Sequence, residues 1–455
     1  MPEDGFATTM SHETTPSPVP ETAKPDGDVL SRWTGTERVV WTERMLTALE
    51  RGVKGGVWFS LMDKVYAEDN LHAAYHQVAA NRGASGVDHI TITEFGRDLD
   101  TNLKRLAEQL KDGTYRPQAI RRVWIPKPGT NAQRPLGIPT VRDRVVQAAL
   151  LHVIEPIFEH QFAEHSYGFR PHRGCKDALR QVEALLREGY VSVVDADLKS
   201  YFDTIPHEPL LKRLRERIAD GPVLALVEAF LRADILSELG SERPEAGAPQ
   251  GAVLSPLLSN IYLNPLDHAM AERGFRMVRY ADDFVILCRS EKEAQHALAG
   301  VQDWTAQAGL TLHPTKTRIV DVRQDGFDFL GYRFQTVKDG SIRHWAGKKA
   351  VRKLRATLRA KTKRTSGQHL EWIIAEVSET LRGWYGYFKH SYHTTFGSLD
   401  GWVRMRLRSI LRKRHRRRGR GKGKDHHRWP NADFTERGLF SLAAAHRLDV
   451  QSSLR

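Results

Sequence analysis

The sequence predicts an α+β region with antiparallel strands, followed by an all-α region that is strongly basic. Three observations support this. Strand-like apolar runs flank short turns at residues 115–139, 275–288 and 327–334, which is the pattern of antiparallel hairpins. Segments with helical periodicity separate these hairpins. After about Gly340 the strand-like pattern ends, and helical stretches rich in Arg, Lys and Trp follow.

The individual elements follow from the same periodicities. Helical patterns occur at about residues 36–81, 93–110, 141–158, 176–187, 209–231, 254–263, 291–308, 348–364, 370–390 and 399–418. Strand patterns occur in the three hairpins and at residues 191–194 and 310–322. A glycine-rich loop covers residues 81–88, where the glycines permit tight turns.

Composition indicates a soluble protein with a polyanionic partner. The chain has 455 residues, of which 40% are hydrophobic and 27% charged, and its formal net charge is +14. Such an excess of positive charge favours nucleic acid as a partner, with an anionic membrane surface as the alternative. The longest apolar run, Val223–Leu231, is about half of a spanning helix, so we expect no membrane partner.

The N-terminal segment and the two cysteines indicate a cytoplasmic protein. Residues 1–35 begin with an acidic stretch rich in Pro, Thr and Ser, which predicts a disordered leader and no signal peptide. The two cysteines, Cys175 and Cys288, are far apart and belong to no CxxC pair. This fits a reduced cytosolic protein and excludes a four-cysteine zinc site.

The hairpin at residues 275–288 carries two adjacent carboxylates at its tip. Tyr280-Ala281-Asp282-Asp283 lies between two apolar, β-prone flanks, so the pattern predicts strand, tight turn and strand. Adjacent acids on a rigid tip repel each other unless a cation neutralises them, and Mg²⁺ takes oxygen ligands of this kind. A solvated β-turn is the alternative, because Asp is a common turn residue.

A second acidic segment supplies the missing ligand for such a site. The strand at 191–194 runs into Asp195 and Asp197, which share one face if the strand persists that far. Carboxylates on neighbouring strands can hold two cations about 4 Å apart, as in a two-metal nucleotidyl transfer site. The spacing does not choose between Asp195 and Asp197. Phe202 follows closely and could pack against a nucleotide sugar or belong to the core.

The hairpin at residues 115–139 predicts a basic face beside this site. Arg121, Arg122, Lys127 and Arg134 interleave with apolar residues, and the Pro-Lys-Pro-Gly turn puts Lys127 near the tip. A lysine in that place could grip a triphosphate. A solvated charged face is the alternative reading.

Eight motifs in order resemble those of group II intron-encoded reverse transcriptases, also called maturases, over about residues 35–445. The motifs are Gly83–Asp88, Arg134–Pro139 with Arg142–Arg144, Ser166–Pro171, Asp197–Asp203, Pro249–Gly251 with Leu254–Leu258, Tyr280–Asp283, Phe329–Tyr332 and Gly383–Phe388. The resemblance implies a right-hand polymerase, with fingers and palm at 36–340 and a thumb/maturase domain at 341–424. Residues 425–455 are then a tail, and this end resembles the branch that lacks the zinc-dependent endonuclease domain.

The resemblance also implies roles for single residues. Asp197, Asp282 and Asp283 would be the catalytic carboxylates on two Mg²⁺ ions, with the Leu198 carbonyl as a further ligand, which selects Asp197 over Asp195. The nucleotide would contact Lys127, Arg134, Phe202 as the gate against ribose, Gln250 and Lys316. For Lys316 an ordinary salt bridge is the alternative. Primer and template would contact Gly251, Tyr280, Leu330, Gly331 and Tyr332.

The basic helical region would bind the structured intron RNA. The residues expected to do so are Arg404, Arg408, Arg412, Lys413, Arg414, Arg416, Arg417 and Arg418. Neutralising many phosphates would make binding tight and salt-dependent. The aromatic residues of this region, such as Trp384 and Trp402, recur at helical spacing, which favours packing over base stacking.

The function that the resemblance implies is RNA-directed DNA synthesis together with assisted splicing. The enzyme would bind its group II intron RNA, promote splicing, and copy the RNA into DNA from a target DNA primer with dNTPs during retrohoming. The alternatives are a domesticated reverse transcriptase in defence or repair, and a non-catalytic RNA-binding splicing factor. The intact Asp197, Asp282 and Asp283 argue against the non-catalytic alternative.

Overall fold

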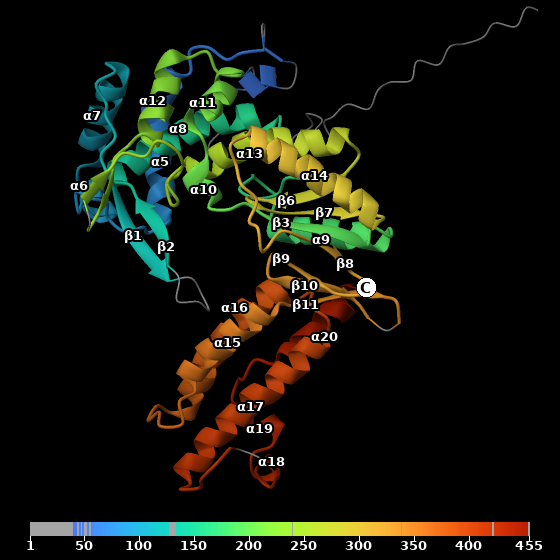
Figure 1. Cartoon of the computed structure of the whole chain (residues 1–455). Coiled ribbons are helices and arrows are strands. Elements are labelled where there is room, and N and C mark those ends of the chain that lie inside the picture. The colour runs from blue at the N-terminus through green and yellow to red at the C-terminus, as the bar shows by residue number, and fades with distance from the viewer. Residues whose placement is uncertain are drawn as a thin grey trace, which may run out of the picture.

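The computed structural model describes residues 40–453, except 43–44, 47, 50–51, 54–55, 127–132, 239, 338 and 421–422. The predicted leader at 1–35 and Lys127 therefore lie outside the described residues. Figure 1 shows a helical part that carries the β1–β2 hairpin, a central part built around a sheet, and an elongated group of C-terminal helices. Sheets and helices alternate as the sequence predicts for an α+β chain.

The N-terminal part combines helices with a small sheet. Its helices are α4 Met62–Val65, α5 Glu68–Ala80, α6 Ile92–Arg97, α7 Leu99–Lys111, α8 Val141–Glu159, α11 His207–Arg215 and α12 Gly221–Leu231. The single helix predicted at 93–110 is in fact two, because the chain breaks at Asp98. The sheet has the order β2-β1-β4-β5, with β1 Ile120–Pro126, β2 Gln133–Ile138, β4 Ile235–Ser237 and β5 Gly240–Glu242. The short strands β4 and β5 were not predicted.

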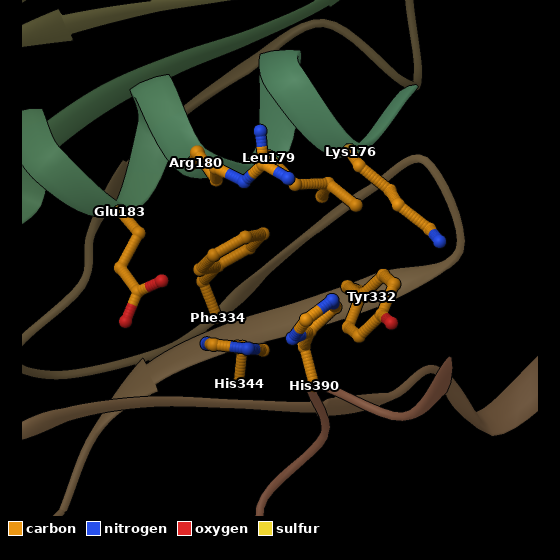
Figure 2. Close-up of a pocket in the computed structure, with 8 residues that line it drawn as sticks. All are labelled: Lys176, Leu179, Arg180, Glu183, Tyr332, Phe334, His344 and His390. Atoms are coloured by element: carbon orange, nitrogen blue, oxygen red, sulfur yellow. The ribbon is translucent and has the colours of Figure 1, made fainter. Parts of the chain in front are cut away.

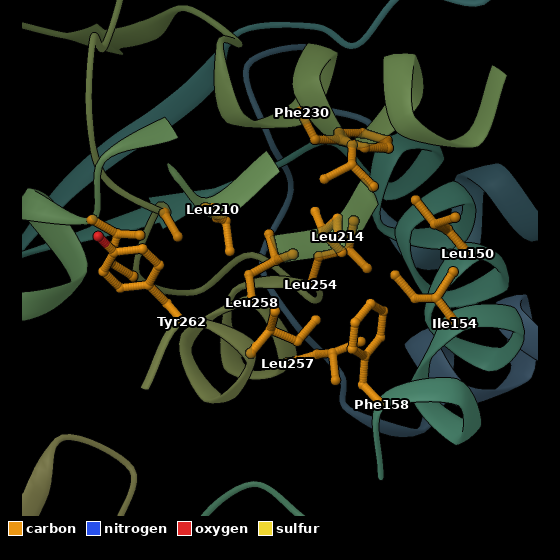
Figure 3. Close-up of a cluster of buried hydrophobic side chains, with 14 of the residues drawn as sticks. Leu150, Ile154, Phe158, Leu210, Leu214, Phe230, Leu254, Leu257, Leu258 and Tyr262 are labelled. Carbon is orange, nitrogen blue, oxygen red and sulfur yellow. The ribbon is translucent and has the colours of Figure 1, made fainter. Parts of the chain in front are cut away.

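The largest core lies where helices of the N-terminal and central parts meet. Figure 3 shows Leu150, Ile154 and Phe158 of α8 facing Leu254 and Leu257 near the start of α13, Ser255–Glu272. These side chains are at most 4% exposed. Burial of this much apolar surface is the dominant favourable contribution to folding, and it fixes α13 beneath the functional site.

The central part is a four-stranded antiparallel sheet with the order β6-β7-β3-β8. Its strands are β3 Ser192–Asp197, β6 Arg276–Tyr280, β7 Asp283–Cys288 and β8 Arg318–Asp321. The strand predicted at 310–322 is thus confined to β8. Helices α13 and α14, Glu291–Gln307, pack with Ile286 and Val194 on one face. Helix α9, Cys175–Arg187, packs with Val193 and Val285 on the other.

A three-stranded sheet covers that second face. It has the order β11-β10-β9, with β9 Phe327–Phe329, β10 Tyr332–Thr336 and β11 Ile342–Ala346. Strand β11 corrects the prediction that no strand follows Gly340. It forms because all five of its residues pair with β10, from Ile342 opposite Thr336 to Ala346 opposite Tyr332. The pairing with β10 supplies the backbone hydrogen bonds of the strand. The composition of the segment, which includes Arg343 and His344, does not indicate a strand.

The C-terminal helices share a core of their own. They are α15 Lys348–Lys361, α16 Leu370–Phe388, α17 Thr394–Arg414, α18 Asp425–Arg428, α19 Asn431–Glu436 and α20 Leu442–Ser453. Trp429, Phe434 and Leu442 of the predicted tail are buried in the same core as α15–α17, so the tail is an integral part of this region. Within the described residues, each helix is too short or too polar to cross a bilayer.

Candidate active site

The Tyr280–Asp283 motif forms the tight turn that the sequence predicts. Tyr280 pairs with Asp283 across β6 and β7, so Ala281 and Asp282 are the two turn residues. Ala281 has φ of 59°, a left-handed conformation that glycine adopts more readily. Asp282 therefore sits at the tip of a rigid hairpin, and Asp283 is the first residue of β7.

Strand β3 brings Asp197 to the same place. It persists to Asp197, and the register puts Asp197 directly opposite Asp283 and Asp195 opposite Val285. Directly paired residues project from the same face of a sheet, so Asp195, Asp197 and Asp283 all point to the face that α9 and β9–β11 cover. The prediction that Asp195 and Asp197 share a face is thus confirmed.

The carboxylates form a buried concentration of negative charge. Burial, followed by the charges of Asp195, Asp282 and Asp197, raises the pKa of Asp283 to about 7. Burial also raises the pKa of Asp282 and of Asp195. Such shifts mean that the charged forms are costly without a counter-charge.

Two basic side chains supply part of that counter-charge. Lys316 donates a hydrogen bond to the Asp197 carboxylate, so the salt bridge considered for Lys316 is present. Arg318 lies 3.4 Å from the Asp195 carboxylate through its Nε. The alternative role of Lys316 toward pyrophosphate is compatible with its position, since its side chain is 60% exposed.

The donor set fits a hard divalent cation. Several carboxylate oxygens share a partly dry site, and this is the ligand chemistry that Mg²⁺ prefers. Among the described residues, no three His, Cys, Asp or Glu side chains already surround one point. Lys316 occupies Oδ2 of Asp197 in this arrangement, so its ammonium group and a metal ion would compete for that oxygen.

The Leu198 carbonyl is compatible with the ligand role expected of it. Leu198 stands opposite Leu312 in an isolated antiparallel bridge. The hydrogen bonds of that bridge run from His313 N–H to the Asp197 carbonyl and from Lys199 N–H to the Thr311 carbonyl, at 2.7 and 2.8 Å. They leave the Leu198 carbonyl outside the bridge.

Phe202 lies on the short helix α10, Tyr201–Thr204, five residues after Asp197 in the chain. Its ring meets the Phe169 ring edge-on, with 6.4 Å between centroids. It also lines a cavity of about 380 Å³ together with Trp124 and Pro249. The half-buried ring thus borders open space, as a gate against ribose would.

Gln250 and Gly251 pack against the β1–β2 hairpin. The Gly137 N–H donates to the Gln250 carbonyl at 2.6 Å. Gly251 has φ of +105°, and a Cβ added there would lie 2.5 Å from the Gly137 carbonyl oxygen. Glycine is therefore required where the motif meets the hairpin, and the contact joins the Pro-Gln-Gly segment to the basic strand β2.

The hairpin does not have a single basic face, which corrects the prediction. The register puts Arg121 opposite Ile138 and Arg134 opposite Ile125, so these two arginines share a face. Arg122 points to the other face, where it pairs with Glu242 at 3.1 Å. Arg121 and Arg122 are adjacent in one strand, so alternation already puts them on opposite faces, and the register decides that Arg121 is the one that shares a face with Arg134.

The predicted primer segment is the tight turn between β9 and β10. Leu330 and Gly331 both have positive φ, 47° and 80°, as a type I′ turn requires. The Leu330 N–H donates a hydrogen bond to Asp283, and its carbonyl accepts one from the Tyr387 hydroxyl at 2.7 Å. Tyr332 in turn donates to the Tyr387 carbonyl at 2.6 Å. The turn thus links the acidic site to α16.

A cavity of about 240 Å³ lies behind this turn. Figure 2 shows Lys176 and Arg180 of α9 on one side and Tyr332 and His344 on the other. Burial lowers the pKa of His344. The lining residues put the cavity between α9 and the β10–β11 pair.

The basic helical region needs one clear correction. Arg408 was expected to bind RNA, but it is only 2% exposed and donates to the Trp429 carbonyl and to Asn431 Oδ1, at 2.9 and 2.7 Å. Its guanidinium thus ties α17 to the α18–α19 segment. Arg412 is also engaged, through an ion pair with Asp425 at 2.6 Å. Both point inward because helical periodicity puts them on the packed face of α17.

The other basic residues of the predicted set are more accessible. Arg404 is half-buried, whereas Lys413, Arg414, Arg416, Arg417 and Arg418 are exposed. Arg414 nevertheless donates to the Gln368 carbonyl. Tyr385 and Phe388 are buried and Trp384 packs against them, so the preference for helix packing over base stacking is confirmed for these three.

Two family descriptions match the chain. Reverse transcriptase (RNA-dependent DNA polymerase) matches residues 125–334, and the group II intron maturase-specific domain matches residues 351–429. Protein YkfC of Escherichia coli is 36% identical over 289 residues, which are 54% of this chain and 75% of that protein. The chain belongs to the group II intron-encoded reverse transcriptases.

Other relatives agree with this assignment. The group II intron-encoded protein LtrA of Lactococcus lactis is 39% identical over 203 residues, 44% of this chain and 33% of LtrA. A 91 kDa protein in the cob intron of Schizosaccharomyces pombe is 28% identical over 59% of this chain and 40% of its own length. The chain thus spans three quarters of YkfC and about a third of LtrA. This chain thus joins an RNA-dependent DNA polymerase domain to a group II intron maturase-specific domain.

One buried residue of the site was missed from the sequence. Arg279 of β6 is 0% exposed and bonds to Asp267 and to the Ala281 carbonyl. The signal was present, because Arg279 interrupts the otherwise apolar run Met277–Tyr280 one residue before the motif. A charge inside an apolar strand requires a partner in the core.

Proposed function

We propose that this reverse transcriptase extends a DNA primer along its intron RNA at the Asp197, Asp282 and Asp283 site, using dNTPs and two Mg²⁺ ions. When bound, the ions would activate the primer hydroxyl and neutralise the triphosphate. The observation that carries the proposal is the direct pairing of Asp197 with Asp283 beside Asp282. The target DNA end would supply the primer during retrohoming.

The surrounding residues have complementary tasks in this proposal. Phe202 excludes the ribose 2′-hydroxyl, and Arg134 with Lys127 grips the triphosphate, where arginine offers a fork and lysine a point charge. Gln250 holds the incoming nucleotide and Lys316 lies within reach of the leaving pyrophosphate. Gly251, Tyr280 and the turn at Leu330, Gly331 and Tyr332 guide primer and template.

The proposed domains follow the same order as a right-hand polymerase. Residues 36–340 would be fingers and palm, and the C-terminal helices the thumb and maturase domain. Because β11 pairs with β10, we move the proposed boundary from residue 340 to Gly347. The protein would act in the bacterial cytosol, at the nucleoid.

The maturase surface is proposed at the exposed arginines that follow α17. Arg416, Arg417 and Arg418 are exposed. A second cationic group surrounds the Trp402 ring of α17, since Arg355, Arg359 and Arg406 all approach this ring within 5.6–5.8 Å. Positive groups gathered in this way favour the phosphates of a structured RNA.

Primer extension on an RNA template with Mg²⁺ tests the polymerase proposal. We expect the wild-type chain to synthesise cDNA and the Asp197→Asn variant to make none. Asp321→Asn is the matched control, because Asp321 lies on the adjacent strand β8, where its carboxylate forms an ion pair with Arg323 at 2.7 Å. Loss of synthesis in the control, or its survival in Asp197→Asn, would refute the assignment.

A further inference from the structure

Arg279 connects the turn that carries Asp282 and Asp283 to two other parts of the fold. All five N–H donors of its guanidinium have acceptors. Nε and Nη2 bind the Asp267 carboxylate of α13 at 2.8 and 2.5 Å. The second Nη2 hydrogen reaches Ser166 Oγ at 2.7 Å. Nη1 reaches Asn260 Oδ1 at 2.9 Å and the Ala281 carbonyl at 2.8 Å.

The bond to Ala281 falls on the strained residue of the turn. Ala281 holds φ of 59° without being glycine, and such a conformation persists only when its surroundings fix it. Its carbonyl belongs to the peptide that joins it to Asp282. A donor fixed on that carbonyl therefore sets the direction from which the Asp282 and Asp283 side chains leave the backbone.

The Ser166–Pro171 loop closes over the same turn. Arg279 N–H donates to the His165 carbonyl, and Tyr167 N–H donates to the Arg279 carbonyl, both at 2.9 Å. A Cβ added to Gly168 would lie 2.2 Å from the Ala281 nitrogen, so only glycine permits this contact. Asn260 completes the enclosure, because its amide donates to the Gly168 carbonyl at 2.8 Å.

We propose that Arg279 is a positioning residue for polymerisation, which holds the Ala281 carbonyl so that Asp282 and Asp283 face the metal ions. This inference rests on the proposed function of the site. The position lies between buried Val278 and half-buried Tyr280, where an apolar side chain would avoid the cost of burying a charge. Only a five-donor fork reaches α13, the loop and the turn together, which is the geometric reason for arginine.

A purely structural role for the Arg279–Asp267 pair is the competing explanation. Removing one partner of a buried ion pair destabilises a protein, whereas removing both and filling the space can restore stability. The double variant Arg279→Met/Asp267→Leu therefore separates the two roles. If Arg279 acts only through stability, activity returns together with the melting temperature. If it positions the turn, activity stays low.

The measurements are the melting temperature, kcat and dNTP KM in primer extension, and Mn²⁺ binding followed by the EPR signal of free Mn²⁺. We expect Arg279→Lys to keep the fold and the charge, because one ammonium can still bind Asp267. It should lower kcat about ten- to a hundredfold with little change in KM, and weaken Mn²⁺ binding several-fold. The double variant should regain melting temperature over Arg279→Met without regaining kcat.

Arg408→Met is the matched control, since Arg408 is also a buried arginine, 2% exposed, and bonds to the Trp429 carbonyl in the C-terminal region. It should lower the melting temperature and leave Mn²⁺ binding unchanged. Wild-type kcat and Mn²⁺ affinity in Arg279→Lys, or full recovery of kcat in the double variant, would overturn the inference. Failure of the proposed function looks different, because wild type itself would then bind no Mn²⁺ that depends on Asp282 and Asp283.

Discussion

Asp197 of β3 and Asp283 of β7 stand directly opposite each other on the same face of the central sheet. Asp282 adjoins them at the tip of the hairpin, and Asp195 lies two residues back along β3. Burial and these neighbouring carboxylates raise the pKa of Asp283 to about 7. The negative charge of these carboxylates thus needs a cation to balance it. Lys316 supplies one positive charge through its ion pair with Asp197.

Replacing Lys316 should separate its two roles. In Lys316→Met, Asp197 is released for metal, so the Mg²⁺ concentration for half-maximal extension should fall. The maximal rate should also fall, by roughly a hundredfold, if Lys316 gives a proton to pyrophosphate. Lys316→Arg should restore the ion pair but not the rate, because arginine does not release a proton. A wild-type rate in Lys316→Met, measured by single-turnover extension, would leave Lys316 with the salt bridge alone.

Shortening Phe202 should open the site to ribonucleotides. In Phe202→Val the ring that borders the 380 Å³ cavity is lost. The ratio of kcat/KM for dNTPs over that for rNTPs should drop by at least about tenfold, because a steric contact worth one to a few kcal/mol is removed. The kcat/KM for dNTPs should change little. An unchanged ratio in paired dNTP and rNTP extension assays would show that Phe202 belongs to the packing alone.

Two groups of arginines in the C-terminal region should respond differently. Replacing exposed Arg416, Arg417 and Arg418 with Gln should weaken intron RNA binding, and the slope of log K against log salt should decrease by about 2–3. Thermal unfolding should not change.

Arg408→Met provides the contrast to that triple variant. It removes the donor to the Trp429 carbonyl and Asn431, which should destabilise the protein by about 1–3 kcal/mol. The salt slope of RNA binding to the folded protein should stay the same. Filter binding at several salt concentrations, run beside thermal melts, checks both variants, and an equal effect of both on either measurement would contradict this division.

Glu155 should make the stability of the protein depend on pH. Burial, and then the charge of Glu159, raises the pKa of Glu155 from 4.5 to about 7. The folded state therefore keeps a proton that the unfolded chain releases, so stability from this group is present below pH 4.5 and is lost as pH rises through 7. The full loss is about 3 kcal/mol.

Substitution by a neutral isostere should remove that dependence. Glu155→Gln carries no charge at any pH, so it should melt several degrees above wild type at pH 8 and differ less at pH 6. Glu108→Gln is the control, because Glu108 is exposed on the outer face of α7, and it should shift neither value. A wild-type advantage at pH 8 would mean that Glu155 is ionised without penalty in the fold.

Much of the candidate site could be predicted from local sequence patterns. Tyr280–Asp283 could be predicted as a tight turn because both flanks are apolar and the turn is only two residues long. Asp195 and Asp197 could be put on one face because strand periodicity is two. The family resemblance then selected Asp197, and its pairing with Asp283 agrees with that choice.

The features that could not be predicted from the sequence depend on contacts between residues that are far apart along the chain. In the sequence Arg408 cannot be told apart from its exposed basic neighbours. It is buried because α17 packs against the segment at Trp429. Strand β11 exists because β10 pairs with it, and Arg122 faces away from Arg134 because of the register with β2. The partners of Arg279 come from three separate segments, at Ser166, at Asn260 with Asp267, and at Ala281. No local pattern contains that information.

The most direct test of the account is the Asp282→Ala/Asp283→Ala variant, assayed for primer extension on RNA and for intron splicing at near-physiological salt. DNA synthesis depends on this hairpin in our proposal, whereas RNA binding depends on the basic helices. We therefore expect no cDNA with Mg²⁺, while RNA binding and assisted splicing stay close to wild type. Synthesis of cDNA by this variant, or loss of RNA binding as complete as in the Arg416, Arg417 and Arg418 triple variant, would contradict the account.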